Sequence, residues 1–215
     1  ISRISINPQT MNQKTLDIIG RKHTVEQMKD AFYLAREMGF SHINMDLIVG
    51  LPGETYEDVE HTMQEVQRMA PDSVTVHSLA IKRAARLSLF KDKYEEMGLE
   101  NNMQIMDMTA KYCAEMELSP YYLYRQKNMA GNFENVGYAK VDKAGIYNIL
   151  IMEEKQTILA AGAGASTKVV LPSDQPEVME SRIERCENVK DVSQYIERID
   201  EMIERKEKFF IENGI

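Results

Sequence analysis

Apolar and polar residues alternate in three short segments of the first third of the chain, and this alternation is typical of β-strands with two unlike faces. The three segments cover residues 2–7, 43–49 and 73–79. Between them, residues 24–38 and 55–70 repeat apolar side chains at helical spacing behind capping signatures. Strands that alternate with helices of about 15 residues indicate right-handed βαβ units and a parallel sheet. We therefore predict an α/β domain over residues 1–86.

The pattern changes beyond residue 86, where helices no longer alternate regularly with strands. The predicted elements are helices over residues 87–97 and 102–118, strands over residues 121–126 and 182–186, a loop over residues 127–145, a β-hairpin of residues 146–152 and 157–161, and a terminal helix capped by Asn188. This order predicts a second, α+β portion over residues 87–215.

The composition argues against several classes of protein. A hydrophobic fraction of 43% over 215 residues suffices for a globular core. A net charge of −8 argues against binding that rests on phosphate neutralisation, so we expect no nucleic-acid partner. The apolar stretches are far shorter than the roughly 20 residues that span a bilayer, so we expect no membrane segment and a cytoplasmic location. Cys113 and Cys186 lie too far apart in sequence to indicate a disulfide framework or a metal centre.

The chain opens at Ile1 directly inside the first predicted strand, without a methionine or a capping segment before it. We therefore expect it to be part of a longer protein. The first strand would then expose an unpaired edge, and edges of this kind recruit other chains. Association through this edge is a further expectation.

Polar side chains share one face of the three parallel strands. On the second strand, Asp46 alternates with aliphatic neighbours, and a carboxylate in a helix-covered sheet is costly unless it has a partner or a ligand. The same face should carry Ser5, Asn7 and Gln9 from the first strand, Asn44 from the second, and Thr75 and His77 from the third. Two readings are open: these residues line a ligand chamber at the carboxyl ends of the strands, or they are buried polar groups that satisfy one another.

Several motifs carry a resemblance to a known family. They are RISINPQT at residues 3–10, GLPGET at 50–55, SLAIKRAARL at 78–87, GNFENVGYA at 131–139 and AAGAGAST at 160–167. Together they resemble the radical S-adenosylmethionine (radical SAM) superfamily, specifically the Z-type branch of the oxygen-independent coproporphyrinogen III dehydrogenases (oxidases). The resemblance implies a partial radical SAM, TIM-like barrel of parallel strands followed by a C-terminal α+β portion.

The resemblance also implies which residues contact S-adenosylmethionine. By their place in the family's motifs these are Gln9, Arg21, Asp46 and Ala80, with Ser166 in a glycine-rich segment that closes over the active site. A carboxylate suits the sulfonium or amino group of this cofactor, and a guanidinium suits its carboxylate. The family usually has Gly-x-Gln-Ser where this chain has residues 7–10, NPQT, which keeps the glutamine but changes the local backbone. No catalytic residue is implied.

In this family three cysteines in a CxxxCxxC motif bind a [4Fe–4S] cluster, and this chain lacks that motif. The chain is therefore expected to be the C-terminal portion of the enzyme and to be inactive alone. The resemblance implies radical oxidative decarboxylation of coproporphyrinogen III, which turns propionates into vinyl groups and gives protoporphyrinogen IX in haem biosynthesis. Two alternatives are a related haem-binding chaperone and a tRNA-modifying radical SAM enzyme. The acidic charge and the SLAIKR segment count against the second of these.

Overall fold

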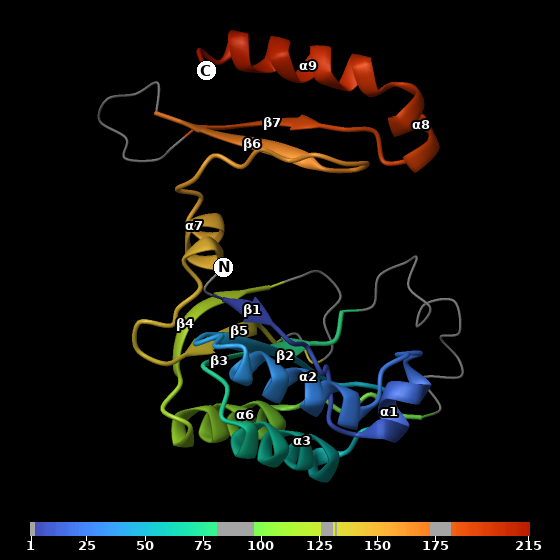
Figure 1. Cartoon of the computed structure of the whole chain (residues 1–215), viewed down its shortest axis with the longest axis vertical. Coiled ribbons are helices and arrows are strands. Elements are labelled where there is room, and N and C mark those ends of the chain that lie inside the picture. Colours follow the sequence, from blue (N-terminus) through green and yellow to red (C-terminus); the bar gives the residue numbers. More distant parts are fainter. Residues whose placement is uncertain (1–2, 81–96, 126–130, 132, 173–181) are drawn as a thin grey trace. The chain divides into compact units, whose positions relative to one another are not determined.

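The structure is a computed structural model that describes residues 3–80, 97–125, 131, 133–172 and 182–215. The chain divides into two units, residues 1–145 and 146–215 (Figure 1). This division falls at residue 145 and not at the predicted residue 86. The reason is that two strands beyond residue 86 join the sheet formed by the parallel strands.

The first unit contains a five-stranded sheet in the order β1-β2-β3-β5-β4. Strands β1 (Ile4–Ser5), β2 (Ile43–Val49) and β3 (Ser73–Ser78) pair in parallel, which confirms the α/β prediction. Strands β4 (Ser119–Tyr124) and β5 (Asn135–Ala139) are antiparallel, and β5 pairs with β3 on one side and β4 on the other. Strand β5 lies in the stretch predicted as a loop, so that prediction was wrong. Its five residues include a glycine, which weakens the strand signal.

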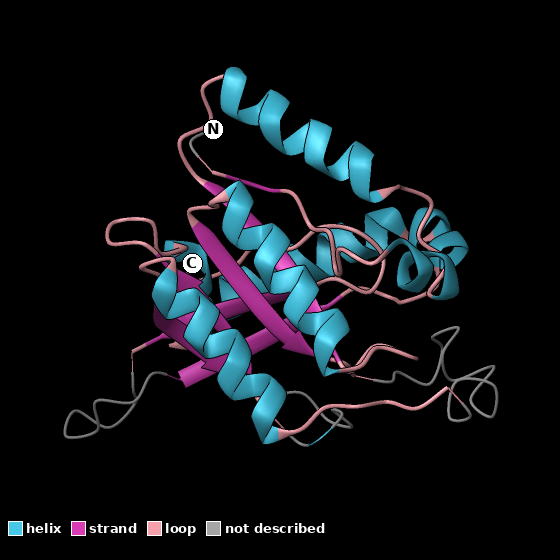
Figure 2. Cartoon of the chain, turned by 90° about the horizontal axis from the view of Figure 1, so that it is seen from below, coloured by secondary structure: helices cyan, strands magenta, loops and turns pink. Residues whose placement is uncertain are grey.

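Helices cover one face of this sheet. They are α2 (Val25–Glu37), α3 (Tyr56–Met69) and α6 (Met103–Glu115), while the short α1 (Gln13–Ile18) follows β1. Figure 2, seen from below, shows helices that lie over the sheet and run alongside the strand seen between them. Met45 of β2 is completely buried in one cluster with Phe32, Val66 and Ile105 from the three helices. Each such side chain contributes about 1.5–3 kcal/mol through burial, which fixes this face of the sheet as the core.

Capping residues set where the helices begin. Thr24 accepts a hydrogen bond from the Gln27 N–H, and the Gln27 side chain accepts one from the Thr24 N–H, so the predicted capping box is present. Before α3, the Thr55 N–H donates to the Asp58 carboxylate at 3.0 Å. Asn102 caps α6, which confirms the helix predicted over residues 102–118. The helix predicted over residues 87–97 lies almost wholly outside the described residues.

The second unit pairs a hairpin with helices. Its elements are α7 (Ile146–Met152), β6 (Ser166–Leu171), β7 (Arg182–Glu187), α8 (Val192–Glu197) and α9 (Ile199–Glu212). Strands β6 and β7 are antiparallel, which confirms the strand predicted at residues 182–186. The hairpin predicted from residues 146–152 and 157–161 was wrong. Residues 146–152 are helical because their apolar side chains also recur four residues apart, and from the second segment Ile158 forms a single bridge with Lys168.

The terminal helix begins later than predicted and is interrupted. Asp191, and not Asn188, is the N-cap: its carboxylate accepts the Gln194 N–H at 2.9 Å. The Asn188 side chain instead donates to the Gly162 carbonyl at 2.8 Å. A non-helical backbone at Arg198 then separates α8 from α9.

Strands β1 and β4 are the outer strands of the five-stranded sheet as far as the structure describes it. Association of chains through β1 therefore stays a prediction. Across the described ranges, none of the helices has the length and apolar character needed to cross a membrane.

Candidate functional site

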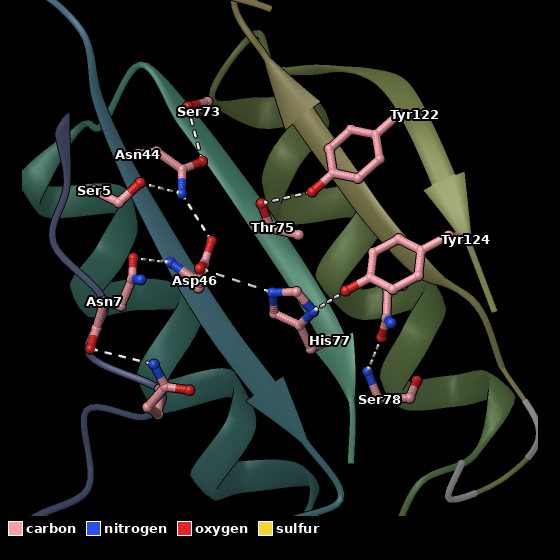
Figure 3. Close-up of polar contacts among 12 residues, drawn as sticks. Ser5, Asn7, Asn44, Asp46, Ser73, Thr75, His77, Ser78, Tyr122 and Tyr124 are labelled. Carbon is pink, nitrogen blue, oxygen red and sulfur yellow. Dashed lines mark hydrogen bonds and ion pairs between the residues drawn. The ribbon is translucent and has the colours of Figure 1, made fainter. Parts of the chain in front are cut away.

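Side chains from three parallel strands meet on the face of the sheet that the helices leave uncovered (Figure 3). We call this set the polar face; its members are Ser5, Asn7, Asn44, Asp46, Ser73, Thr75 and His77. The alternation in the sequence predicted all of these residues except Ser73, because the intervening residues of β2 and β3 point into the core. Two interpretations were predicted for these residues: they line a ligand site, or they are buried polar groups that satisfy one another's hydrogen bonds. The contacts and the exposure of Asp46 bear on both.

Asp46 lies at the centre of the polar face. Its Oδ1 accepts a hydrogen bond from Asn44 Nδ2 at 2.7 Å, and its Oδ2 lies 3.9 Å from His77 Nε2. The Asp46 backbone N–H donates to Asn7 Oδ1 at 3.2 Å. The side chain is 28% exposed, so the carboxylate is partnered on the sheet side and still open to solvent. Asp46 is therefore able to meet a ligand.

The surroundings of Asp46 keep it ionised. Burial, the largest influence, disfavours the charged form, but the neighbouring His77 and Asn44 outweigh it and lower the pKa of Asp46 below its ordinary value. The site thus presents a negative charge at neutral pH. Such a group attracts a cationic ligand or one that donates hydrogen bonds.

Two tyrosines of β4 extend the polar face, and the sequence reasoning missed both. The Tyr124 hydroxyl lies 3.3 Å from His77 Nδ1, and the Tyr122 hydroxyl lies 3.5 Å from Thr75 Oγ1 (Figure 3). Burial raises the pKa of Tyr122 to about 12, so its phenol stays neutral. The strand itself was predicted, but its place next to β5, which separates it from β3, depends on antiparallel pairing that local patterns do not show.

Gln9 and Asp46 are brought together through their backbones. The Gln9 N–H donates to the Asp46 carbonyl at 3.1 Å, and the Gln9 carbonyl accepts the Ile48 N–H at 2.8 Å. Gln9 has a φ of 68°, a left-handed conformation that costs a residue with a side chain about 1–2 kcal/mol.

A buried polar cluster ties the GLPGET loop to the segment after β1. Glu54 Oε1 accepts hydrogen bonds from Thr10 Oγ1 at 2.5 Å and from Asn12 Nδ2 at 3.0 Å. Thr62 of α3 completes the cluster, 3.2 Å from Thr10. Burial raises the pKa of Glu54 although these hydrogen bonds oppose the rise. The cluster fixes the loops at the carboxyl ends of β1 and β2 against each other.

The remaining predicted contacts stay predictions. Arg21 is exposed after α1, where its backbone N–H donates to the Leu16 carbonyl. Ala80 is half-buried directly beyond β3, and Ser166 begins β6 in the second unit. The structure thus joins Gln9 and Asp46, and it shows no such direct link for the other three within the described residues.

The residues of this chain fit a cationic cofactor and do not fit an iron–sulfur cluster. An ionised, partly exposed Asp46 suits the cationic groups of S-adenosylmethionine. The sequence holds two cysteines, fewer than the three thiolates a cluster of the family needs. Burial raises the pKa of the Cys113 thiol to about 12, and Cys186 is buried in the other unit. No group of three His, Cys, Asp or Glu side chains that could hold a metal occurs in the part of the chain that the structure describes.

Comparison with known proteins identifies the family. Residues 1–66, which include β1, β2 and most of α3, match the sequence profile of the Radical SAM superfamily. The chain belongs to this superfamily. Asp46 of β2 and Gln9 of the segment after β1 thus lie inside the matched radical SAM segment.

Two relatives and one solved structure show which radical SAM proteins this chain is similar to. The oxygen-independent coproporphyrinogen-III oxidase-like protein HemZ of Bacillus subtilis is 44% identical over 97% of this chain and 40% of its own length. The heme chaperone HemW of the same organism is 34% identical over 38% of this chain and 22% of its own length. The structure of coproporphyrinogen III oxidase (HemN) from Escherichia coli has a TM-score of 0.65 at 20% identity, over 94% of this chain and 44% of that chain, and it shows the shared fold. The chain spans less than half the length of each.

Proposed function

We propose that this chain is the S-adenosylmethionine-binding portion of an oxygen-independent coproporphyrinogen III oxidase (dehydrogenase) that acts in haem biosynthesis in the cytoplasm. The observation that carries this proposal is the 44% identity, over 97% of the chain, to a protein named oxygen-independent coproporphyrinogen-III oxidase-like. The accessible carboxylate on the polar face supports it, because this cofactor carries a cationic sulfonium and an amino group.

The residues of the polar face would bind and orient the cofactor. The ionised Asp46 would accept hydrogen bonds from its cationic end, and Arg21 would pair with its carboxylate. Two backbone hydrogen bonds of Gln9 hold the segment after β1 against β2, and so position this segment beside Asp46. When bound, the cofactor supplies the radical chemistry of the reaction. The ligands of the [4Fe–4S] cluster would come from residues outside this chain, since the chain has two cysteines.

The proposed substrate is coproporphyrinogen III. In each oxidative decarboxylation a propionate side chain would lose one hydrogen atom, from the carbon next to the ring, to the radical that the bound cofactor supplies, and would lose its carboxyl group as carbon dioxide, which leaves a vinyl group. One further electron leaves the substrate and passes to an acceptor. Two such steps give protoporphyrinogen IX.

Haem binding and delivery is a second candidate function. The observation that favours it is the match to the heme chaperone HemW, which is 34% identical over 82 residues. That match is shorter and weaker than the match to HemZ. A tRNA-modifying activity remains a third hypothesis, and the net charge of −8 weighs against it.

Anaerobic assays of the complete protein with its cluster reconstituted separate these functions. The protein is incubated with S-adenosylmethionine, a reductant, an electron acceptor and coproporphyrinogen III, and the product is oxidised and measured by porphyrin fluorescence. Formation of protoporphyrin supports the oxidase, and the Asp46→Asn variant should form it more slowly. Tight haem binding, seen by absorbance titration, without any conversion of coproporphyrinogen III would overturn the oxidase in favour of the chaperone.

A further inference from the structure

Three side chains from three strands form a continuous row across the polar face. Tyr124 of β4 lies 3.3 Å from His77 Nδ1, and His77 Nε2 of β3 lies 3.9 Å from Asp46 Oδ2 of β2 (Figure 3). The rings of Tyr124 and His77 meet edge to face at 71°. None of these three contacts is explained by the packing of the core, because all three side chains stand on the face opposite the helices.

The donors and acceptors available on these three side chains determine which atom donates and which accepts at each contact. The ionised Asp46 can only accept, so a nitrogen that faces it must carry a hydrogen. A neutral imidazole has one N–H and one acceptor nitrogen. If Nε2 carries the hydrogen, Nδ1 is left as the acceptor for the hydroxyl hydrogen of Tyr124. The opposite tautomer would leave a nitrogen lone pair facing a carboxylate.

We propose that Tyr124 and His77 are positioning residues that orient the carboxylate of Asp46. Tyr124 donates to His77 Nδ1 and so fixes the Nε2–H tautomer, which attracts Asp46 Oδ2. Asn44 holds the other oxygen, Oδ1, at 2.7 Å. With one oxygen held by each neighbour, the carboxylate has a defined plane, and its remaining lone pairs are available to a ligand. At 3.9 Å the contact from His77 is longer than a full hydrogen bond and acts by electrostatic attraction.

The tautomer of His77 can be measured in this chain without any cofactor. Long-range ¹H–¹⁵N NMR spectra of histidine-labelled protein distinguish the two tautomers, and a His77→Gln variant identifies the signal of His77 among the four histidines. We expect the Nε2–H form in the wild type and a mixture in Tyr124→Phe. Tyr122→Phe is the matched control: it removes a hydroxyl from the same strand and face, but that hydroxyl contacts Thr75. An Nδ1–H form in the wild type, or equal changes in the two Phe variants, would overturn the proposal.

Cofactor binding to the complete protein gives the second test, and this part rests on the proposed function. His77→Leu should weaken S-adenosylmethionine binding by about threefold to tenfold, an effect no larger than that of one hydrogen bond, because Asp46 loses one of the two neighbours that orient its carboxylate. His77→Gln should bind nearly as well as the wild type, because its amide N–H can take the place of Nε2–H. Combined with Asp46→Asn, His77→Leu should add little, since its effect passes through Asp46.

The two experiments fail in different ways. If Asp46→Asn leaves binding of the cofactor unchanged, the assigned role of Asp46 in the proposed function is wrong, while the NMR result still decides the positioning of Asp46. If the tautomer is as expected but His77→Leu weakens binding equally with and without Asp46→Asn, then His77 acts independently of Asp46 and the positioning role is wrong.

Discussion

A Cβ atom at Gly137 would lie 1.9 Å from the ring of Tyr122. Gly137 is paired with Thr75 of β3 on one side and with Tyr122 of β4 on the other. The ring therefore lies over the bare backbone of β5, and its hydroxyl reaches Thr75 across the strand. A glycine that weakens β5 as a strand is what admits an aromatic side chain to the polar face.

Substituting Gly137 by alanine should displace Tyr122. Because the new methyl group and the ring cannot share the space, we expect the free energy of unfolding to fall by about 1–3 kcal/mol, the usual cost of overpacking. Urea denaturation measures this loss. In a Tyr122→Ala background the same substitution should cost little or nothing, because the ring is gone. Equal costs in both backgrounds would mean that the ring is not what excludes a side chain at this position.

Replacing Asp46 by asparagine separates binding from folding. The change keeps the size of the side chain and removes its charge, so S-adenosylmethionine binding to the complete, cluster-loaded protein should weaken by roughly 1.5–3 kcal/mol. That loss corresponds to about tenfold or more in affinity. The melting temperature should stay nearly the same, because no cavity or unpaired buried charge is created. Unchanged affinity with a large fall in melting temperature would identify Asp46 as a structural carboxylate.

Glu54 should make stability depend on pH. Its pKa in the folded protein lies above the ordinary value of 4.5, so the folded state binds more protons than the unfolded state once the pH rises past 4.5. The free energy of unfolding should therefore fall as the pH rises from 4.5 through the higher folded pKa, and then level off. Glu54→Gln, which cannot ionise, should lack this fall. Denaturation curves at a series of pH values give the comparison.

Removing the side chain of Glu54 should be more harmful than neutralising it. Glu54→Ala removes the carboxylate oxygen that both Thr10 and Asn12 donate to, and we expect a loss of about 1–3 kcal/mol. A smaller loss for alanine than for glutamine would contradict the view that the cluster is held by these two hydrogen bonds.

The left-handed backbone at Gln9 can be tested by residue type. Asparagine adopts this conformation readily, whereas valine does so poorly, so Gln9→Val should be less stable than Gln9→Asn by about 1–2 kcal/mol. Thermal melting of the two variants checks this difference. Since both variants lose the glutamine side chain, the comparison isolates the backbone. Equal stabilities would show that the conformation at this position relaxes when the side chain changes.

Association through β1 is open to a direct test. We expect this chain to form concentration-dependent assemblies, since β1 is an outer strand of the described sheet and presents unpaired backbone groups. Analytical ultracentrifugation measures the assembly. Replacing Ser5 by proline removes one N–H donor of this strand and should reduce association. A strictly monomeric chain at all concentrations would contradict the expectation.

The sequence predicted those parts of the fold whose two faces differ in chemistry. Strands β2 and β3 alternate core residues with Asp46, Thr75 and His77, so their pattern has one interpretation. Residues 146–152 are apolar at both strand and helix spacing, so their pattern has two interpretations. In the structure these residues form a helix. The resemblance to a family pointed to Asp46 and Gln9. Tyr124 and Tyr122 could not be assigned to the site, because their place depends on β5, a strand that contains a glycine and has little signal of its own.

The strand order β3-β5-β4 has a consequence during protein synthesis. The ribosome completes β3 and β4 before it makes β5, yet β5 lies between them and pairs with both. Until residues 135–139 have emerged, the nascent chain carries two strands whose facing edges have no partner, and such edges are prone to intermolecular pairing. The pairing of β5 with β3 joins segments that are distant in sequence, whereas β4 and β5 lie close together along the chain, so we expect the β3–β5 pairing to form more slowly than the β4–β5 pairing. The row of polar side chains from Tyr124 through His77 to Asp46 therefore forms only when the last strand of the sheet is inserted.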